Sequence, residues 1–525
     1  MKKLFLSPKS LKGLFVLLCL VRVVSIVFWL FLPLGSGLLA QSKKVELLHA
    51  NSLEFDEKLG KDIKRLIGNV QFKHEGALMY CDSAYLYPDN SLDAFSNVRI
   101  QQGDSLNLYG QFLKYNGNTR MAEVQKNIRL VDKGMTLTTE LLFYDMRSTL
   151  ATYPNGGTIV SKQNTLTSKK GYYNPGTKAF SFKENVVLTN PEYVMNSDTL
   201  IYNTGTKTSF FTGPTRIKSK GNNIYCEYGW YNTDKDIALF SKNAYILTQG
   251  QKLKGDSISY DQKNGIGKAY GNVSIIDTVE NIITAGDFAV HNEKEEKSLV
   301  TGHALLKQYF DTDTLFLHAD TLCAIDEHPT LKGIKDTSVT WRKLFAYRNV
   351  KFFRNDIQGK CDSLVYSYKD SIMRLYKAPV LWSGKNQLTA EKVELKMSGG
   401  EIKNMFLKTK ALIVSKEDSA KFNQIKGKDM TGYFRDNKLV KIFVEGNGQT
   451  IYYAKDKNSL IGINKAECSN LMIFVKENKV DKITFLNKPD ATMFPMSDFS
   501  PKEFLLKDFI WRETERPFSF NDIFR

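Results

Sequence analysis

Acidic residues recur at regular intervals along this chain, and carboxylates in such a series can bind calcium or form a catalytic acid–base pair. Each interval contributes one carboxylate, at the start of a predicted strand. Local turn hydrogen bonds, which Asp side chains commonly make, explain this pattern better than a metal site or a catalytic pair does. We therefore interpret the series as structural. Its members are Asp82, Asp198, Asp256, Asp287, Asp320 and Asp362.

A denser group of polar residues lies further along the chain, where Asp311-Thr312-Asp313 precedes His318-Ala319-Asp320. Its spacing matches no metal-binding signature. The sequence also lacks GxSxG, HExxH and phosphate-loop patterns, and its six His residues are scattered. A β-solenoid lyase or hydrolase needs acidic or basic side chains clustered over one outer face, and the outward positions show no such cluster. We expect no enzymatic activity, no metal and no cofactor.

The carboxylate series is part of a repeat with a period of 29 residues. A large side chain follows each acidic position by four residues, and a second motif, Asn followed by alternating apolar residues, begins about sixteen residues after it. Such regularity is the signature of a repeat architecture. The aligned positions are Asp82, Gln111, Glu140, Lys169, Asp198, Glu227 and Asp256, followed by Asp287 and Asp320 at 31 and 33 residues. The large residues are Leu86, Tyr115, Tyr144, Tyr173, Tyr202, Tyr231 and Tyr260, and second motifs begin at Asn69, Asn97, Asn127, Asn185, Asn243 and Asn272.

Both motifs place apolar residues at alternate positions, which predicts two strands, each with one face toward an interior. Turn formers such as Asn116-Gly117-Asn118 and Asn264-Gly265 separate them. No useful helical periodicity occurs from 53 to 309, which excludes parallel strands joined by helices. A two-strand repeat buries its apolar face only by stacking on its neighbours. The fold class is therefore all-β, an elongated antiparallel array of two-strand repeats of about 29 residues.

Five cysteines follow residue 42, and three of them, Cys81, Cys226 and Cys361, directly precede the acidic position. Equivalent residues lie whole repeats apart, too far for a disulfide. We expect free thiols that act as small buried fillers.

The N-terminal segment, residues 1–42, has basic residues before an apolar run and a small-residue cleavage point at Ala40, which is typical of an export signal. An uncleaved inner-membrane anchor is the alternative. The first 40 residues contain five basic and no acidic side chains, so their removal lowers the formal net charge from +17 to +12. An exported basic protein suits anionic envelope partners better than nucleic acid, so we expect no nucleic-acid partner. The alternative is a solvated surface whose excess charge only aids solubility.

The repeat pattern divides the rest of the chain into four parts. Residues 43–325 form the regular array, 326–345 read as an inserted loop, 346–490 continue the array with longer units, and 491–525 depart from the pattern. The last part contains Phe509-Ile510-Trp511. It either docks on an envelope partner by adding to an open sheet end or folds back as a cap over the last repeat.

The recurring motifs resemble those of the OstA-like family. Gly-Asn-Val-x-Ile occurs at residues 271–275 and, in a near form, at 68–72, and Cys361 to Tyr366 reads Cys-Asp-Ser-Leu-Val-Tyr. The likeness covers about 51–323 well and 349–486 more loosely. The family includes the LptA proteins and the periplasmic domain of LptD. It forms a V-shaped β-jellyroll, or β-taco, that carries lipopolysaccharide from the inner to the outer membrane.

The resemblance implies a periplasmic protein with a hydrophobic conduit for the lipid A acyl chains of lipopolysaccharide. It also implies Lpt-type partners in the inner and outer membranes, joined by end-to-end sheet addition. Simple core packing is the alternative explanation of the inward residues, and the protein would then be an exported scaffold or adhesin. The inward candidates for lipid contact are Val70, Phe72, Val98, Ile100, Ile128, Leu130, Val186, Leu188, Leu200, Tyr202, Ile258, Tyr260, Val273 and Ile275.

Overall fold

The computed structural model describes residues 44–525, except 56–59, 61, 133, 175–176, 249, 312, 332–333, 337, 457–458 and 477–478. The predicted export segment, residues 1–42, lies outside the described residues. The described part of the chain consists almost entirely of β-strands and contains no α-helix, which confirms the predicted fold class. No helix in it has the length and apolar character needed to cross a bilayer.

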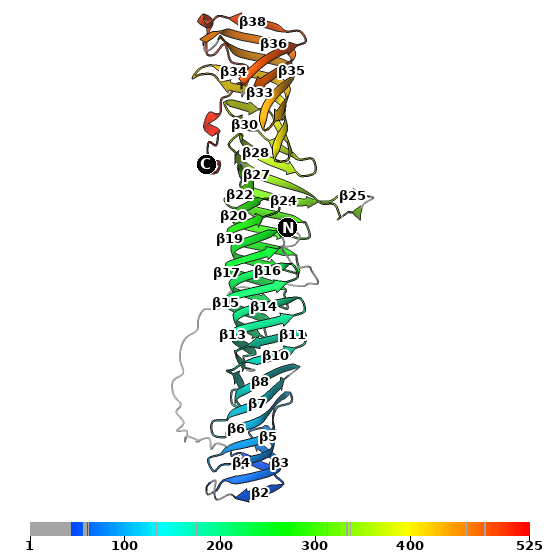
Figure 1. The fold of residues 1–525 in the computed structure, drawn as a ribbon, viewed down its shortest axis with the longest axis vertical. Coiled ribbons are helices and arrows are strands. Elements are labelled where there is room, and N and C mark those ends of the chain that lie inside the picture. The colour runs from blue at the N-terminus through cyan, green and yellow to red at the C-terminus, as the bar shows by residue number, and fades with distance from the viewer. Residues whose placement is uncertain are drawn as a thin grey trace, which may run out of the picture. The chain divides into compact units, whose positions relative to one another are not determined.

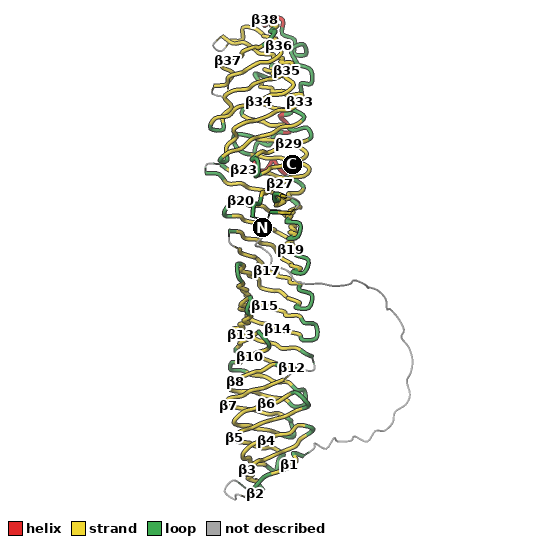
Figure 2. The backbone as a smooth tube through the Cα atoms, turned by 90° about the vertical axis from the view of Figure 1, so that its right-hand side faces the viewer, coloured by secondary structure: helices red, strands yellow, loops and turns green. Residues whose placement is uncertain are grey.

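The described residues fall into two compact units, and within each unit the strands stack in chain order (Figures 1 and 2). The N-terminal unit comprises 44–246 with 261–263, and the C-terminal unit comprises 247–260 with 264–525. The pairings are antiparallel, as in β4 with β5 and β35 with β36. The strands that begin in the N-terminal unit are β1 (Glu46–His49), β2 (Ser52–Phe55), β3 (Lys64–His74), β4 (Ala77–Leu86), β5 (Ser91–Gln102), β6 (Leu106–Asn116), β7 (Met121–Asp132), β8 (Met135–Asp145), β9 (Leu150–Tyr153), β10 (Gly157–Ser161), β11 (Asn164–Ser168), β12 (Lys170–Asn174), β13 (Ala179–Asn190), β14 (Tyr193–Asn203), β15 (Thr208–Ser219), β16 (Asn222–Asn232) and β17 (Ile237–Thr248).

The C-terminal unit has longer strands toward its end, and short 3-10 helices follow the last strand. A small hairpin of β25 and β26 lies between β24 and β27. The strands are β18 (Gln251–Asp261), β19 (Ile266–Asp277), β20 (Ile282–Asn292), β21 (Lys297–Thr301), β22 (Leu305–Tyr309), β23 (Thr314–His318), β24 (Thr321–Glu327), β25 (Thr330–Leu331), β26 (Ile334–Lys335), β27 (Trp341–Phe353), β28 (Gln358–Ser367), β29 (Ile372–Tyr376), β30 (Val380–Ser383), β31 (Asn386–Thr389), β32 (Lys392–Ser398), β33 (Glu401–Lys416), β34 (Phe422–Arg435), β35 (Lys438–Asp456), β36 (Ser459–Lys476), β37 (Lys479–Leu486) and β38 (Asp490–Phe494). The 3-10 helices are η1 (Met496–Asp498), η2 (Glu513–Glu515) and η3 (Phe520–Phe524).

A two-residue bulge bends many strands near their middle. In β5 the bulge is Ser96 and Asn97, with φ of 62° and 51°, and the pairing with β4 shifts between Tyr80 and Ser83. Asn tolerates this left-handed conformation better than most residues. The bend divides each strand into two halves, so the stack consists of two leaves that meet at a corner. Both leaves turn their apolar side chains inward: Leu130 and Ile159 of one leaf line the same cavity as Phe180 of the other.

The acidic series lies along this corner, and four of its six members hold a bulge in place through an Asn or His side chain. The Asp82 carboxylate accepts a hydrogen bond of 2.8 Å from the Asn97 side chain. The role is structural, as predicted, but the partner is the bulge residue of the adjacent strand rather than a residue of the same turn. The same bond recurs between Glu227 and Asn243, Asp256 and Asn272, and Asp320 and Asn349, and His303 replaces Asn opposite Asp287.

Small residues fill the inside of the corner, directly before each acidic position. At Gly110 an added Cβ would lie 2.4 Å from the Val124 side chain, so a larger residue does not fit there. Cysteine occupies the same position in three repeats. The five cysteines of the described chain are free and buried, as predicted: Cys81, Cys226, Cys323, Cys361 and Cys468.

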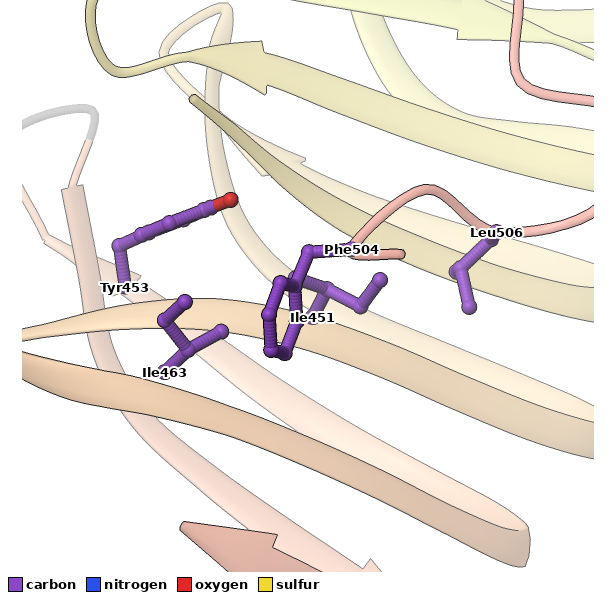
Figure 3. Close-up of a cluster of buried hydrophobic side chains, with 5 residues drawn as sticks. All are labelled: Ile451, Tyr453, Ile463, Phe504 and Leu506. Carbon is purple, nitrogen blue, oxygen red and sulfur yellow. The ribbon is translucent and has the colours of Figure 1, made fainter. Parts of the chain in front are cut away.

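The tail, residues 495–525, folds back along the outer face of the C-terminal unit. Gln424, which is fully buried, donates to the Phe504 carbonyl and accepts from the Leu506 amide. Gln387 makes the equivalent pair of bonds with Ile510 and Arg512. A cap would cover only the last strands, β36 to β38, whereas the tail also contacts β34 and β31. Figure 3 shows the cluster that it completes, in which Phe504 and Leu506 pack near Ile451, Tyr453 and Ile463.

Candidate functional site

The interior between the two leaves contains the residues predicted to contact lipid. Twelve of the fourteen candidates are buried, and Leu188 and Tyr202 are half-buried. Burial alone fits both lipid contact and core packing, so lipid contact remains a prediction. The buried twelve are Val70, Phe72, Val98, Ile100, Ile128, Leu130, Val186, Leu200, Ile258, Tyr260, Val273 and Ile275.

In the N-terminal unit, side chains fill the part of the interior around Tyr153. The cavity between Leu130, Ile159 and Phe180 measures only about 10 Å³. A cavity needs about 10–15 Å³ of such space to hold a single water molecule, so this one has no room for an acyl chain as it stands. An added Cβ at Gly171 would lie 2.2 Å from the Tyr153 ring, which shows how closely the backbone approaches that ring.

A row of tyrosines closes the side of this unit opposite the corner. Tyr115 and His74 Nδ1 form a hydrogen bond of 2.6 Å, Tyr144 donates to the Gln102 side-chain oxygen, and Tyr173 donates to the Asp132 carboxylate at 3.0 Å. Each pair joins the strand ends of one leaf to those of the other. We call these three pairs the tyrosine seam: His74–Tyr115, Gln102–Tyr144 and Asp132–Tyr173.

The seam is largely removed from water. His74, Asp132, Tyr115 and Tyr144 are buried, and the ion pair of Arg120 with Glu75, at 2.8 Å, lies beside the first pair. Burial raises the pKa of Tyr115 to about 12, and it raises the pKa of Tyr144 as well. The hydroxyls therefore stay protonated at neutral pH.

Tyr173 is protonated for two reasons. Burial raises its pKa to about 12, and its hydrogen bond to the Asp132 carboxylate adds to the rise. Its hydroxyl therefore remains a donor to Asp132 at neutral pH.

The C-terminal unit contains a larger interior cavity of about 70 Å³, open at a polar mouth. Apolar side chains from both leaves form most of its wall. Its polar groups come from Gln251, Asp277, Thr284, Ser298, Arg342 and Tyr368. The volume exceeds that of one water molecule, but an acyl chain fits only if the leaves separate further. The apolar lining is Ile275, Ile282, Val300, Leu306, Leu322, Cys323, Ala324, Leu344 and Phe345.

Opposite charges stand at this mouth. Arg342 donates to Asp326 at 2.9 Å. Burial disfavours the Arg342 charge, but the bond to Asp326 outweighs it, so the pKa of Arg342 lies above its usual range. Burial likewise acts against the Asp277 charge, yet the backbone amide of Glu280 and the Gln251 side chain, at 2.7 Å, lower the pKa of that carboxyl. The charges at the mouth are therefore fixed: Arg342 stays cationic in its pair with Asp326, and Asp277 stays anionic.

The polar group singled out between Asp311 and Asp320 does not form a site. Asp313 binds Asn355 at 3.0 Å, His318 contacts the Ala304 carbonyl at 2.9 Å, and Asp320 binds Asn349. Within the residues that the structure describes, no group of three or more His, Cys, Asp or Glu side chains is placed to hold a metal.

The tyrosine seam is the feature that the sequence reasoning missed. The repeated Tyr was identified as a large inward side chain, and its hydroxyl was given no role. The available signal was the polar residue that precedes each of Tyr115, Tyr144 and Tyr173 by 41 or 42 positions.

Comparisons with known proteins agree with the motif resemblance. Residues 42–198 match the family model described as OstA-like protein. Among solved structures, similarity is found to LptH from Pseudomonas aeruginosa, described as the LptA homologous periplasmic component of the conserved lipopolysaccharide transport device. That match has 15% identity and a TM-score of 0.19, and covers 20% of this chain and 81% of LptH. No curated protein matches the sequence. Over residues 42–198, the chain therefore matches the OstA-like family, as its repeated motifs indicate.

Proposed function

We propose that this protein is a periplasmic lipopolysaccharide-binding transport protein. Its interior would shield acyl chains between the inner and outer membranes, while phosphorylated sugar headgroups remain outside. The observation that carries the proposal is the cavity of the C-terminal unit, whose wall is apolar on both leaves and whose mouth is polar. Each methylene moved from water into such an interior gains about 0.8 kcal/mol. The family match over 42–198 supports lipopolysaccharide as the ligand.

The chain supplies binding and shielding, and the driving force would come from partners. Lpt-type components of the two membranes are the partners we propose, joined by strand addition. Two places support this mode: β1 and β2 pair with β3, and β37 and β38 pair with β36, so that short strands border longer ones. Export by the segment 1–42 would place the chain in the periplasm, and cell fractionation tests this.

An exported scaffold with a packed core is the second candidate function. The filled interior around Tyr153 favours it, because no ligand fits there unless the leaves move. The scaffold would present its outer face to proteins or glycans, and its interior would never contact lipid.

Photo-crosslinking in cells separates the two functions. A photoreactive amino acid replaces Ile275, which lines the cavity and is 9% exposed, and the matched control replaces Ser274, whose side chain alternates to the outer face. Transport predicts that Ile275 captures lipopolysaccharide and Ser274 does not. Capture only at Ser274, or at neither position in cells that contain the folded protein, would overturn the proposal in favour of the scaffold.

A further inference from the structure

We propose that the tyrosine seam is a gate: its three cross-leaf hydrogen bonds keep the N-terminal unit shut, and they must part before an acyl chain enters there. This inference rests on the proposed function. It assigns a task to the recurrent Tyr that core packing alone does not require, because Phe would fill the same space without a hydroxyl.

The geometry places every bond of the seam across the two leaves. His74, Gln102 and Asp132 end the strands β3, β5 and β7. Their partners lie close to the ends of β6, β8 and β12, each 41 or 42 residues later. Each of the three pairs thus joins a strand end on one leaf to a strand end on the other, so the interior cannot open at this side without breaking these bonds.

The chemistry suits a closure that can reopen. His74 and Asp132 are buried polar side chains, 3% and 8% exposed, at positions where apolar residues would pack at no cost in desolvation. A hydrogen bond of this kind changes an equilibrium by roughly fivefold, and by more where a carboxylate accepts. Three bonds therefore hold the leaves together, but water can replace them when the leaves separate.

The direction of the tyrosine hydrogen bond differs between Tyr173 and Tyr260. Where Tyr173 bonds across the leaves, the adjacent cavity measures about 10 Å³. In the C-terminal unit, the equivalent Tyr260 donates a hydrogen bond of 3.1 Å to the Glu293 carboxylate. The Glu293 amide bonds to the Gly265 carbonyl in the turn after Tyr260, so Glu293 and Tyr260 lie on the same leaf. That unit contains the cavity of about 70 Å³.

Two native cysteines report on the gate without a ligand. Cys81 and Cys226 are both buried in the N-terminal unit, and burial raises the pKa of each thiol to about 12, so each reacts only when the structure around it opens. Cys81 lies on β4, among the strands that the seam joins, whereas Cys226 lies on β16, beyond them.

The test removes only the hydroxyls, in a triple variant of the full chain with Tyr115→Phe, Tyr144→Phe and Tyr173→Phe. N-ethylmaleimide labelling is followed site by site by mass spectrometry. We expect Cys81 to label about tenfold faster or more, and Cys226 to label at the rate of the unaltered chain. Tyr85→Phe, an outward-facing tyrosine on β4, is the matched control and should change neither rate. Equally faster labelling of both cysteines would show general destabilisation. Unchanged labelling of Cys81 would show that the three hydrogen bonds do not keep the leaves closed. Either result overturns the gate.

A spin-labelled stearate then separates the gate from the proposed function. The gate predicts faster uptake by the triple variant than by the unaltered chain. Uptake by both at equal rates would overturn the gate and leave the transport function standing. Failure of both to take up the probe would count against the transport function, while Cys81 labelling would still decide whether the seam holds the leaves together.

Discussion

At the scale of single residues, the repeat is explained by what each position does at a bend. The carboxylate holds the bulge, the small residue before the carboxylate makes room inside the corner, and the Asn of the bulge accepts a left-handed backbone. Asn-Val-x-Ile and Asp-x-x-x-Tyr recur together because the Asp of one motif bonds to the bulge Asn of the other at each bend. The acidic series therefore needs no metal or catalytic role to account for its regularity.

The bulge residue Asn97 offers a direct test of this explanation. Asn97→Ala loses the bond to Asp82 and puts a residue that tolerates the left-handed region less well than Asn at a φ of 51°, so we expect the free energy of unfolding to fall by about 1–3 kcal/mol. Asn97→Gly loses only the bond and should be the less destabilised variant. Urea denaturation followed by circular dichroism measures both. A Gly variant less stable than the Ala variant would contradict the backbone argument.

At the scale of elements, alternating apolar residues and turn formers predicted the strands and the all-β class correctly, because both signals depend only on residues that are close in the sequence. The corner was not predicted, because the only sequence signal of a bulge is an Asn or Gly before two apolar residues, and this pattern is also common outside bulges. The tyrosine seam was missed because its partners are two strands apart. The tail has no periodicity of its own, and its path depends on Gln387 and Gln424, which read as ordinary polar residues.

Ion pairs add to the hydrogen bonds and apolar contacts that hold the tail, and this predicts an acid-sensitive attachment. Arg512 foremost, and also Lys360, lower the pKa of Glu515 from 4.5 to about 2. A carboxyl with a lowered folded pKa stabilises the docked tail above its unfolded pKa, and the effect is lost as pH falls through the folded one. We expect the tail to become more protease-sensitive between pH 4.5 and about 2, and at high salt.

Glu515→Gln is the control for this attachment, because it removes the charge at every pH. The variant should show weaker tail protection at pH 7 and a smaller change on acidification, measured by hydrogen exchange of residues 500–525. The same loss of protection in both proteins across the acid range would show that Glu515 does not anchor the tail.

At the scale of the whole molecule, each of the two units is an array in which a repeat contacts its neighbours. Stability of such an array is close to a sum over repeats and their interfaces, so a repeat is removable if the register of the strands is kept. The tyrosine seam limits which deletions are tolerated, because the two residues of each pair lie in different repeats. After a deletion, each seam residue that remains on one leaf must still face a tyrosine on the other leaf.

Deletion of residues 111–139 meets both conditions. It removes one full period and joins Gly110 to Glu140, two equivalent points at the corner, so every later strand keeps its direction and its inward face. Tyr144 then takes the place of Tyr115 opposite His74, and Tyr173 takes the place of Tyr144 opposite Gln102. We expect a folded protein with a shorter seam, detected by an unchanged β-sheet circular dichroism spectrum per residue and slow labelling of Cys81.

Deletion of residues 111–124 is the matched control, because it removes about half a period and joins the middle of β6 to the middle of β7. Those two strands run in opposite directions, so the fused segment cannot pair in register with the strands on both sides of it. The array should therefore lose its fold at this point. If the half-period deletion folded as well as the full-period deletion, stacking of similar strands would suffice for this fold, and neither the corner nor the seam would define its register.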